Sequence, residues 1–428
     1  MSNNVRVLGM APESGRWILV IVGMIIQLCL GAIYAYGIIR VPLSAYFKSL
    51  MVAVDPASKG PSAMDMTWPF IVFLGVFALT MPLAGPYIQK MGPKKVCMVG
   101  GAICGLGWIA ASFASSTLTL AILYGVIGGF GVGIAYGCPI ATSAQWFPDK
   151  RGLAVGLTVL GFGFSAALIG PINDYLVATQ GGIMNTLRIF GVGFFIITVA
   201  LSTLLMFPPA GWKPEGWTPP APKPGAAAKA EFMRSEMSKT STFYGLWLCY
   251  TIGAMAGLTA IGIAKPVGLE VVGATAGAFL TGLTFPFALA NGLGRPIFGT
   301  LTDKLTPRNT AMLSYVLIIL ACLLIYTNYA STTMYIISFA LLWGCLGGWL
   351  AIAPTATATY FGMKDYAKNY GLVFTAYGAG AVIGGIVSAQ AKDLMGAYQP
   401  FFLIVAALAV VGMIVAFVMM KPAEKKAA

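Results

Sequence analysis

Long apolar segments, each about twenty residues in length, are the feature that most restricts how this chain can fold. Segments of this length cross the hydrocarbon core of a bilayer as helices, because a helix bonds its own backbone polar groups. The composition agrees, since 58% of the residues are hydrophobic and 9% are charged, against about 25% charged residues in soluble domains. The sequence therefore predicts an all-α membrane protein. Twelve transmembrane segments can be delimited: 17–39, 67–89, 95–115, 118–142, 152–177, 186–208, 242–264, 274–299, 309–329, 332–359, 368–391 and 399–420.

The basic residues are distributed unevenly between the loops. An even number of spans places both termini on one side of the membrane. The loops on the side of the termini hold nineteen Lys and Arg residues, and the loops on the other side hold six. The positive-inside rule then predicts cytoplasmic termini in a multi-pass protein of the plasma membrane or bacterial inner membrane. The same rule accounts for the net charge of +13 without a nucleic-acid partner.

One hydrophilic linker divides the apolar segments into six and six. The stretch from Pro208 to Lys239 is rich in Pro, Ala and charged residues, a composition that does not build a core of its own. We therefore expect an N-terminal six-helix half at 1–208, a cytoplasmic linker at 209–241 and a C-terminal six-helix half at 242–428. Two similar halves of this kind are expected to pack around a site near the middle of the bilayer.

Arg295 lies inside the apolar segment 274–299. An arginine cannot lose its proton, and at the bilayer centre it costs about 2.5–3.5 kcal/mol on insertion scales. We expect every other Lys and Arg in a loop or at a helix end, and no carboxylate inside the membrane to pair with Arg295. Arg295 is therefore interpreted as the ligand of an anion. The alternative is that it reaches an interface or bonds to backbone carbonyls.

The sequence holds little that favours catalysis or metal binding. It has no histidine, and its seven cysteines lie in apolar runs without CxxC spacing. Neither a Ser/His/Asp nor a Cys/His nor a paired-carboxylate arrangement is visible. The glycine-rich runs at 125–133, 156–163 and 378–385 follow no predicted strand, so they indicate helix contact faces and not nucleotide binding. We expect no enzyme activity, cofactor or metal site.

Several loops repeat between the two halves and carry a family resemblance. Segments 85–95 (GPYIQKMGPKK) and 299–308 (GTLTDKLTPR) resemble the signature loop of the major facilitator superfamily, although Gln89 replaces the acidic residue in the first copy. Segments 131–166 and 356–385, with WFPDKRG, KNYG and the pair Asn291 and Arg295, resemble the oxalate/formate antiporter family. The chain is also similar to bacterial monocarboxylate transporters. The resemblance covers essentially the whole helical chain and implies the twelve-helix fold of that superfamily, which works by alternating access.

The resemblance also implies roles for particular residues. In similar monocarboxylate transporters an arginine in the eighth helix holds a carboxylate, which implies this role for Arg295. Oxalate-exchanging members carry a second cation where this chain has Tyr377, so that one cation here matches one carboxylate. Animal relatives carry an aspartate where this chain has Asn291, one helical turn from Arg295; the amide can donate a hydrogen bond toward the anion but cannot carry a proton. By resemblance, Tyr34, Tyr136 and Tyr377 face the cavity.

Three further aromatic residues complete the predicted wall of the substrate site. Trp343 and Trp349 lie in segment 332–359, and Phe374 lies in segment 368–391. The alternative for all these rings is ordinary packing or a place in an interfacial belt, which is where membrane aromatics are commonly found. Lys265, near the end of segment 242–264, is interpreted as an interface anchor.

Together these observations predict a monomeric secondary transporter of a small monocarboxylate anion such as lactate, pyruvate, acetate or formate. The coupling stays open between proton symport and anion exchange, because no residue expected at mid-membrane can carry a proton. Oxalate:formate antiport is the alternative within this class. An alternative from another class is a membrane substrate sensor that binds its ligand and does not transport it.

Overall fold

The regular structure of the described residues is entirely helical. The computed structural model describes residues 6–209, 211–218, 231–362 and 364–422, and no strand lies among them. The first part comprises α1 (Pro12–Leu30), η1 (Gly31–Ala35), α2 (Tyr36–Val54), α3 (Ala63–Met91), α4 (Pro93–Ala111), α5 (Thr117–Leu120), η2 (Ala121–Gly128), α6 (Gly129–Ala135), α7 (Gly137–Trp146), α8 (Arg151–Thr179) and α9 (Ile183–Ser202). The second part comprises α10 (Arg234–Met237), α11 (Ser241–Val272), α12 (Gly277–Gly282), α13 (Thr284–Leu305), α14 (Pro307–Thr327), α15 (Thr332–Phe361), α16 (Tyr366–Met395) and α17 (Gln399–Met419).

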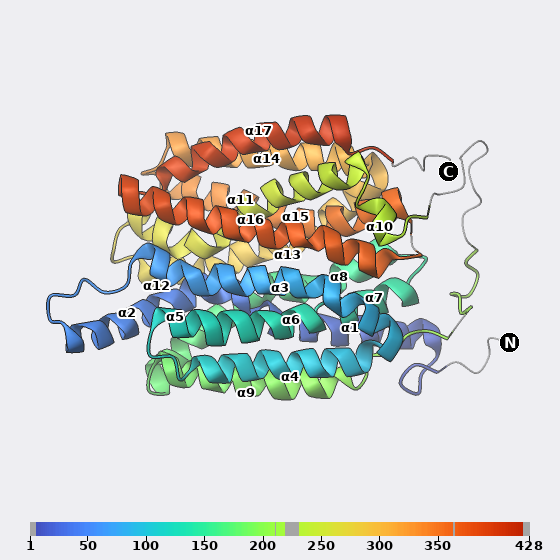
Figure 1. Cartoon of the computed structure of the whole chain (residues 1–428), viewed down its shortest axis with the longest axis horizontal. Coiled ribbons are helices and arrows are strands. Elements are labelled where there is room, and N and C mark those ends of the chain that lie inside the picture. Colours follow the sequence, from blue (N-terminus) through green and yellow to red (C-terminus); the bar gives the residue numbers. More distant parts are fainter. Residues whose placement is uncertain (1–5, 210, 219–230, 363, 423–428) are drawn as a thin grey trace.

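The long helices run side by side in one bundle (Figure 1). The helices before residue 203, coloured blue to green, form the lower half of the view, and those after residue 240, coloured yellow to red, form the upper half. The first helix begins and the last helix ends at the same end of the bundle, as an even number of spans requires. We call this end the termini end and the opposite one the far end.

Eleven helical stretches in the described residues are long and apolar enough to cross a membrane. The twelfth predicted span corresponds to α12 and α13, where the chain leaves the helix at Leu283 and resumes it at once. This span is interrupted and is less apolar than the others because it carries Arg295, yet α13 packs against both α8 and α15. The predicted all-α membrane fold is confirmed.

Several helices are longer than the apolar segments predicted. The first continues from α1 through η1 into α2 over 43 residues, about 64 Å at 1.5 Å per residue, which is twice the hydrocarbon thickness. Arg40 therefore lies within a helix and is buried, and Lys265 lies within α11, whereas Arg16 is buried near the start of α1. The expectation that every cation except Arg295 falls in a loop or at a helix end was wrong. The expectation failed because hydropathy marks the part of a helix that spans the hydrocarbon core and does not show where the helix ends.

The glycine-rich runs are helix contact faces, as predicted. In the first run, a Cβ on Gly131 would collide with the backbone of Cys104 on α4. In the second, a Cβ on Gly161 would collide with the backbone of Met24 on α1. In the third, a Cβ on Gly378 would collide with Ala78 on α3. Small residues at these positions let the helix backbones approach closely.

Both described parts of the predicted linker pack against the bundle. Trp212 lies edge-to-face on Trp146 at the end of α7, with ring centroids 4.7 Å apart. Phe232 is buried, and its backbone N–H donates to the carbonyl of Phe361 at the end of α15 over 3.0 Å. Residues 219–230 of the linker lie outside the described residues. The division into domains at 1–208, 209–241 and 242–428 stays a prediction.

Candidate functional site

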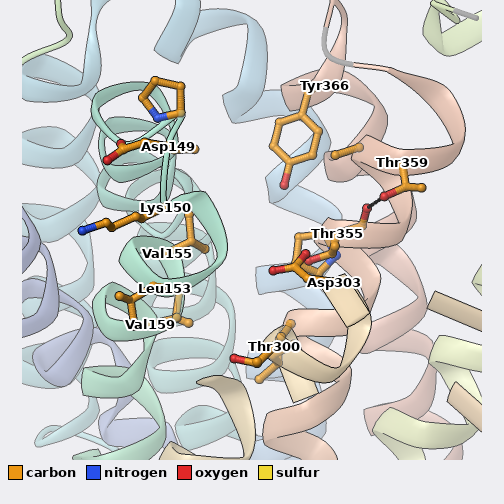
Figure 2. Close-up of a pocket in the computed structure, with 18 of the residues that line it drawn as sticks. Asp149, Lys150, Leu153, Val155, Val159, Thr300, Asp303, Thr355, Thr359 and Tyr366 are labelled. Atoms are coloured by element: carbon orange, nitrogen blue, oxygen red, sulfur yellow. Dashed lines mark hydrogen bonds between the residues drawn. The ribbon is translucent and has the colours of Figure 1, made fainter. Parts of the chain in front are cut away.

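A cavity of about 520 Å³ opens between the two halves of the bundle. One wall comes from the loop after α7 and from α8, and the other comes from α13, α15 and the start of α16 (Figure 2). The side-chain oxygen atoms of Thr300 and Asp303 point from the second wall toward the first, and the hydroxyl of Tyr366 points along the cavity (Figure 2). The lining includes Asp149 beyond the end of α7 and Glu231 of the linker, so the cavity opens at the termini end.

Arg295 lies just beyond the inner end of this cavity. Val159 on α8 lines the cavity, and its carbonyl oxygen accepts a 2.6 Å hydrogen bond from Arg295 Nη1. Arg295 is 0% exposed, and no acidic group lies within ion-pair distance of it among the described residues. Its Nε has no hydrogen-bond partner. A fully buried cation therefore has one strong neutral partner and unused donor capacity.

The alternative interpretation, that Arg295 reaches an interface or bonds to backbone carbonyls, agrees with the structure only in part. The side chain bonds to one backbone carbonyl, but it does not reach an interface, because it is completely buried between α13, which carries it, and α8. The carbonyl of Val159 belongs to the other half of the chain. The contact thus links the two halves at the inner end of the cavity.

Asn291 orients Arg295 in this structure. Its Oδ1 accepts a 3.3 Å hydrogen bond from Arg295 Nη2, and its Nδ2 donates over 2.9 Å to the carbonyl of Trp343 on α15. The shared helix face that the four-residue spacing predicts is therefore present. The amide N–H₂ that we expected to point toward an anion bonds instead to the backbone of α15.

Close helix packing confines the guanidinium. A Cβ on Gly163 of α8 would collide with Asn291 Oδ1 and would lie 3.0 Å from Arg295 Nε. On the other side of α13, a Cβ on Gly347 of α15 would collide with the backbone of Asn291. Pro296 inside α13 removes one backbone donor next to Arg295. The absence of side chains on these glycines is what leaves room for the charged group.

The predicted tyrosines lie together around Arg295. The hydroxyls of Tyr34 and Tyr377 are 2.8 Å apart and join η1 of the first half to α16 of the second. The guanidinium interacts electrostatically with the hydroxyls of Tyr34 and Tyr136. Phe374 stacks on Tyr377 with a centroid distance of 4.8 Å and lies 5.5 Å from the Tyr136 ring. All four aromatic residues are fully buried.

The two predicted tryptophans differ in position. Trp343 is joined to Asn291 through its carbonyl, and its ring lies 5.8 Å from Phe287. Trp349 lies farther out, stacked at 6.0 Å on Tyr250, which in turn contacts Tyr377. Both indole N–H groups are buried without a hydrogen-bond partner. Trp343 is thus adjacent to the site, whereas Trp349 supports the ring behind it.

The sequence analysis missed residues that complete the site. Phe162 on α8 lies 5.9 Å from the Arg295 guanidinium, and Phe77 on α3 contacts the rings of Tyr136, Phe374 and Tyr377. The electrostatic neighbours of Tyr250 on α11 include Tyr34, Tyr136 and Arg295. The only sequence signal for Phe162 was its position within the glycine-rich run 156–163. Phe77 and Tyr250 had none, because aromatic residues occur throughout the apolar segments.

The comparisons with known proteins are consistent with this architecture. The family model described as Major Facilitator Superfamily matches residues 17–288 and 246–428. The oxalate:formate antiporter of Oxalobacter formigenes is 28% identical over 81% of this chain and 80% of that protein. The apicoplast pyruvate carrier 1 of Toxoplasma gondii is 24% identical over 82% and 79% of the two chains. Monocarboxylate transporter 13 of Rattus norvegicus is 24% identical over 94% and 88%.

The fold has close counterparts among solved structures. A bacterial homolog of the human lysosomal transporter Spinster, inward-facing and unoccupied, superposes with a TM-score of 0.68 at 16% identity, covering 95% of this chain and 97% of that one. The occupied inward-facing form gives 0.66 at 16% identity, covering 97% and 98%. At this identity the likeness concerns the fold alone. The family match, the fold and the relatives together show that the chain belongs to the major facilitator superfamily and is a membrane transporter, not an enzyme.

Proposed function

We propose that the protein carries a small monocarboxylate across the membrane by alternating access, with Arg295 as the ligand of the carboxylate. The observation that carries the proposal is a fully buried arginine at the inner end of the cavity with no acidic partner among the described residues. A buried charge is stable only when it is paired or well bonded. An anionic substrate would supply the missing negative charge.

The contact between Arg295 and Val159 supports a coupling between binding and movement. Arg295 Nη1 now donates to a carbonyl of the opposite half. A carboxylate accepts stronger, charge-assisted and bidentate bonds from a guanidinium than a neutral carbonyl does. Substrate would therefore replace the Val159 carbonyl and release one contact between the halves. In this scheme Asn291 holds the guanidinium in place, while Tyr34, Tyr136, Tyr377, Phe374 and Trp343 enclose the apolar part of the substrate and Trp349 supports them.

The choice of a monocarboxylate follows from charge matching. Arg295 is the single cation among the residues that the described structure brings together at this point, with Tyr34, Tyr136 and Tyr377 as neutral neighbours. The relatives named as a pyruvate carrier and a monocarboxylate transporter agree with such a substrate. The relative named as an oxalate:formate antiporter keeps oxalate:formate exchange as a second candidate.

The energetics and the surroundings belong to the same proposal. Within the described part of the chain no acid lies at ion-pair distance from Arg295, so the substrate exchanges with another anion or enters with a proton that it carries itself. The uneven distribution of Lys and Arg places the termini end in the cytoplasm, in the plasma membrane or a bacterial inner membrane. In that orientation the cavity of about 520 Å³ faces the cytoplasm. We propose a monomer, with the bilayer around the exposed apolar faces and with halves at 1–208 and 242–428.

Counterflow in proteoliposomes tests this function. Vesicles loaded with unlabelled lactate are diluted into traces of labelled lactate, pyruvate, acetate, formate or oxalate, with and without a pH gradient. We expect transient accumulation of labelled monocarboxylate that does not require the gradient. Oxalate exchanging with formate, without lactate counterflow, would favour the second candidate. Saturable binding with no flux of any of these anions would favour a sensor and contradict the proposal.

A further inference from the structure

A second cation, Lys265, faces the interior between the two halves. It lies within α11 and is half-buried, and its Nζ donates a 2.9 Å hydrogen bond to Thr281 Oγ1 on α12. No carboxylate of the described residues lies within ion-pair distance of it. Glu270, the acid nearest to it in sequence, pairs with Lys392 over 2.6 Å. Lys265 therefore retains an uncompensated charge and two further ammonium donors.

Lys265 lines a small cavity that both halves of the chain enclose. Tyr34, Gly37 and Ile38 come from the first half, and Lys265, Thr284 and Trp343 are among the residues from the second. The volume is about 10 Å³, which holds one water molecule at most. The indole N–H of Trp343 is fully buried and has no hydrogen-bond partner. The residue with a charge that lacks a counter-ion and the residue with a buried donor that lacks an acceptor thus line the same cavity.

This cavity lies on the side of Arg295 that faces away from the termini-end cavity. Thr284 precedes Arg295 by eleven residues on α13, about 16 Å along the helix toward the far end. Tyr34 and Trp343 connect the two places. Tyr34 lines the small cavity and interacts with Arg295, and Trp343 lines it and bonds to Asn291 through its carbonyl.

Beside this small cavity, toward the far end, the two halves are in direct contact. A Cβ on Gly37 of α2 would lie 2.9 Å from the carbonyl oxygen of Ile261 on α11. Because the cavity walls belong to both halves, separating the halves at the far end would widen the cavity and expose Lys265 along the route to Arg295.

We propose that Lys265 and the Trp343 N–H form an outer binding site for the carboxylate of the substrate, filled before Arg295 is reached from the far end. This inference rests on the proposed function, and it adds a second binding site to the same transport pathway. A lysine ammonium is a flexible point charge, whereas an arginine presents a rigid fork. Lys265 is therefore suited to attract and release the anion, and Arg295 to hold it.

Uptake from the far-end side tests the outer site. In cells expressing the full chain, Lys265→Met should raise the half-saturation concentration of external monocarboxylate about tenfold at low ionic strength, the lower end of the effect of charged clefts, with little change in the maximal rate. Raising the salt concentration should weaken wild-type uptake and leave Lys265→Met nearly unaffected, since salt screens the attraction. Lys265→Arg should keep the salt dependence. Trp343→Phe keeps the ring beside Phe287 and should raise the half-saturation concentration by less.

The matched control is Lys48→Met. It removes the same charge from an exposed position near the end of α2, at the same end of the molecule, outside this cavity. Lys48→Met should behave as the wild type. An unchanged half-saturation concentration and salt dependence in Lys265→Met would overturn the outer site, as would a lower maximal rate alone, which would mark a structural role. If the wild type moves none of the monocarboxylates in counterflow, the proposed function itself fails.

Discussion

Arg16 and Arg295 are both buried, but the structure treats their charges in opposite ways. Arg16 at the start of α1 is 5% exposed and pairs with Glu13 at 2.5 Å and with Asp149 at 2.8 Å. Its guanidinium also lies 4.5 Å from the ring centroid of Phe147. Arg295 is 0% exposed, and its partners among the described residues are neutral: a carbonyl oxygen, an amide oxygen and the hydroxyls of Tyr34 and Tyr136.

The difference separates a fixed ion pair from a site that awaits its counter-ion. Arg16 joins α1 to the loop after α7, and its acidic partners are built into the chain. Arg295 has no such partner within the described residues, although its burial is greater. We infer that acidic residues of the chain balance the charge of Arg16 permanently. The charge of Arg295 is balanced only while an anionic substrate is bound. Each prediction below changes one side of this comparison.

The largest expected effect is the loss of transport caused by Arg295→Lys. Lysine keeps the charge but presents no planar fork for a carboxylate. Losing one hydrogen bond to a charged group costs about 1.5–3 kcal/mol, so we expect initial uptake to fall roughly 10- to 100-fold. Expression and thermal stability should stay close to those of the wild type. Near-normal uptake in reconstituted Arg295→Lys protein would remove Arg295 from the site.

Arg16→Met should show the reverse pattern. Removing the arginine leaves Asp149, which is 13% exposed, without its partner, and we expect a loss of about 1–3 kcal/mol in stability. The thermal unfolding midpoint in detergent should fall, while uptake per folded molecule remains near that of the wild type. The double variant Arg16→Met/Asp149→Asn should be less destabilised than the two single changes added together. Strict additivity would show that the pair is not coupled.

A smaller effect is expected from adding one methyl group beside Arg295. In Gly163→Ala the new Cβ would meet Asn291 Oδ1 and Arg295 Nε, so the guanidinium must shift. A 1 Å misplacement of a binding group can cost about 100-fold; because the side chain can adjust in part, we expect about a tenfold loss of uptake. Gly156→Ala is the matched control on the same helix, since its Cβ would lie 3.7 Å from Pro296, an ordinary contact. Equal uptake by the two variants would contradict the assigned role of the Gly163 contact.

The smallest expected effect is a change in the pH profile of Asn291→Asp. A protonated aspartate can donate to the Trp343 carbonyl as Asn291 does, and it leaves the guanidinium free for substrate. An ionised aspartate would pair with Arg295 and compete with the anion. Uptake by Asn291→Asp should therefore rise more steeply than that of the wild type as the pH falls. Superimposable normalised profiles would show that position 291 does not govern the response to protons.

The sequence was sufficient for the fold class and for the centre of the candidate site. The length of the apolar segments predicted the helices. Arg295 could be recognised because it is a single charged residue within an apolar segment. The four-residue spacing then predicted that Asn291 lies on the same face, as the hydrogen bond confirms. Glycine runs predicted the close helix contacts for the same local reason.

The remaining parts of the site depend on contacts between distant segments. Val159 and Gly163 reach Arg295 because α8 packs against α13, a pairing between the halves that no local period encodes. The ends of the long helices could not be predicted either, because only the part of a helix within the hydrocarbon core needs an apolar sequence. For this reason the positions of Lys265 inside α11 and of Arg40 inside α2 emerged only from the structure.

Direct binding to purified protein tests the central claim, that Arg295 holds an anionic substrate. Lactate, pyruvate, acetate and formate are titrated calorimetrically against the wild type, Arg295→Gln and Arg16→Met in detergent. We predict saturable binding of at least one monocarboxylate to the wild type and to Arg16→Met, at one site per chain, and no detectable binding to folded Arg295→Gln. Equal affinity of Arg295→Gln and the wild type would contradict the account.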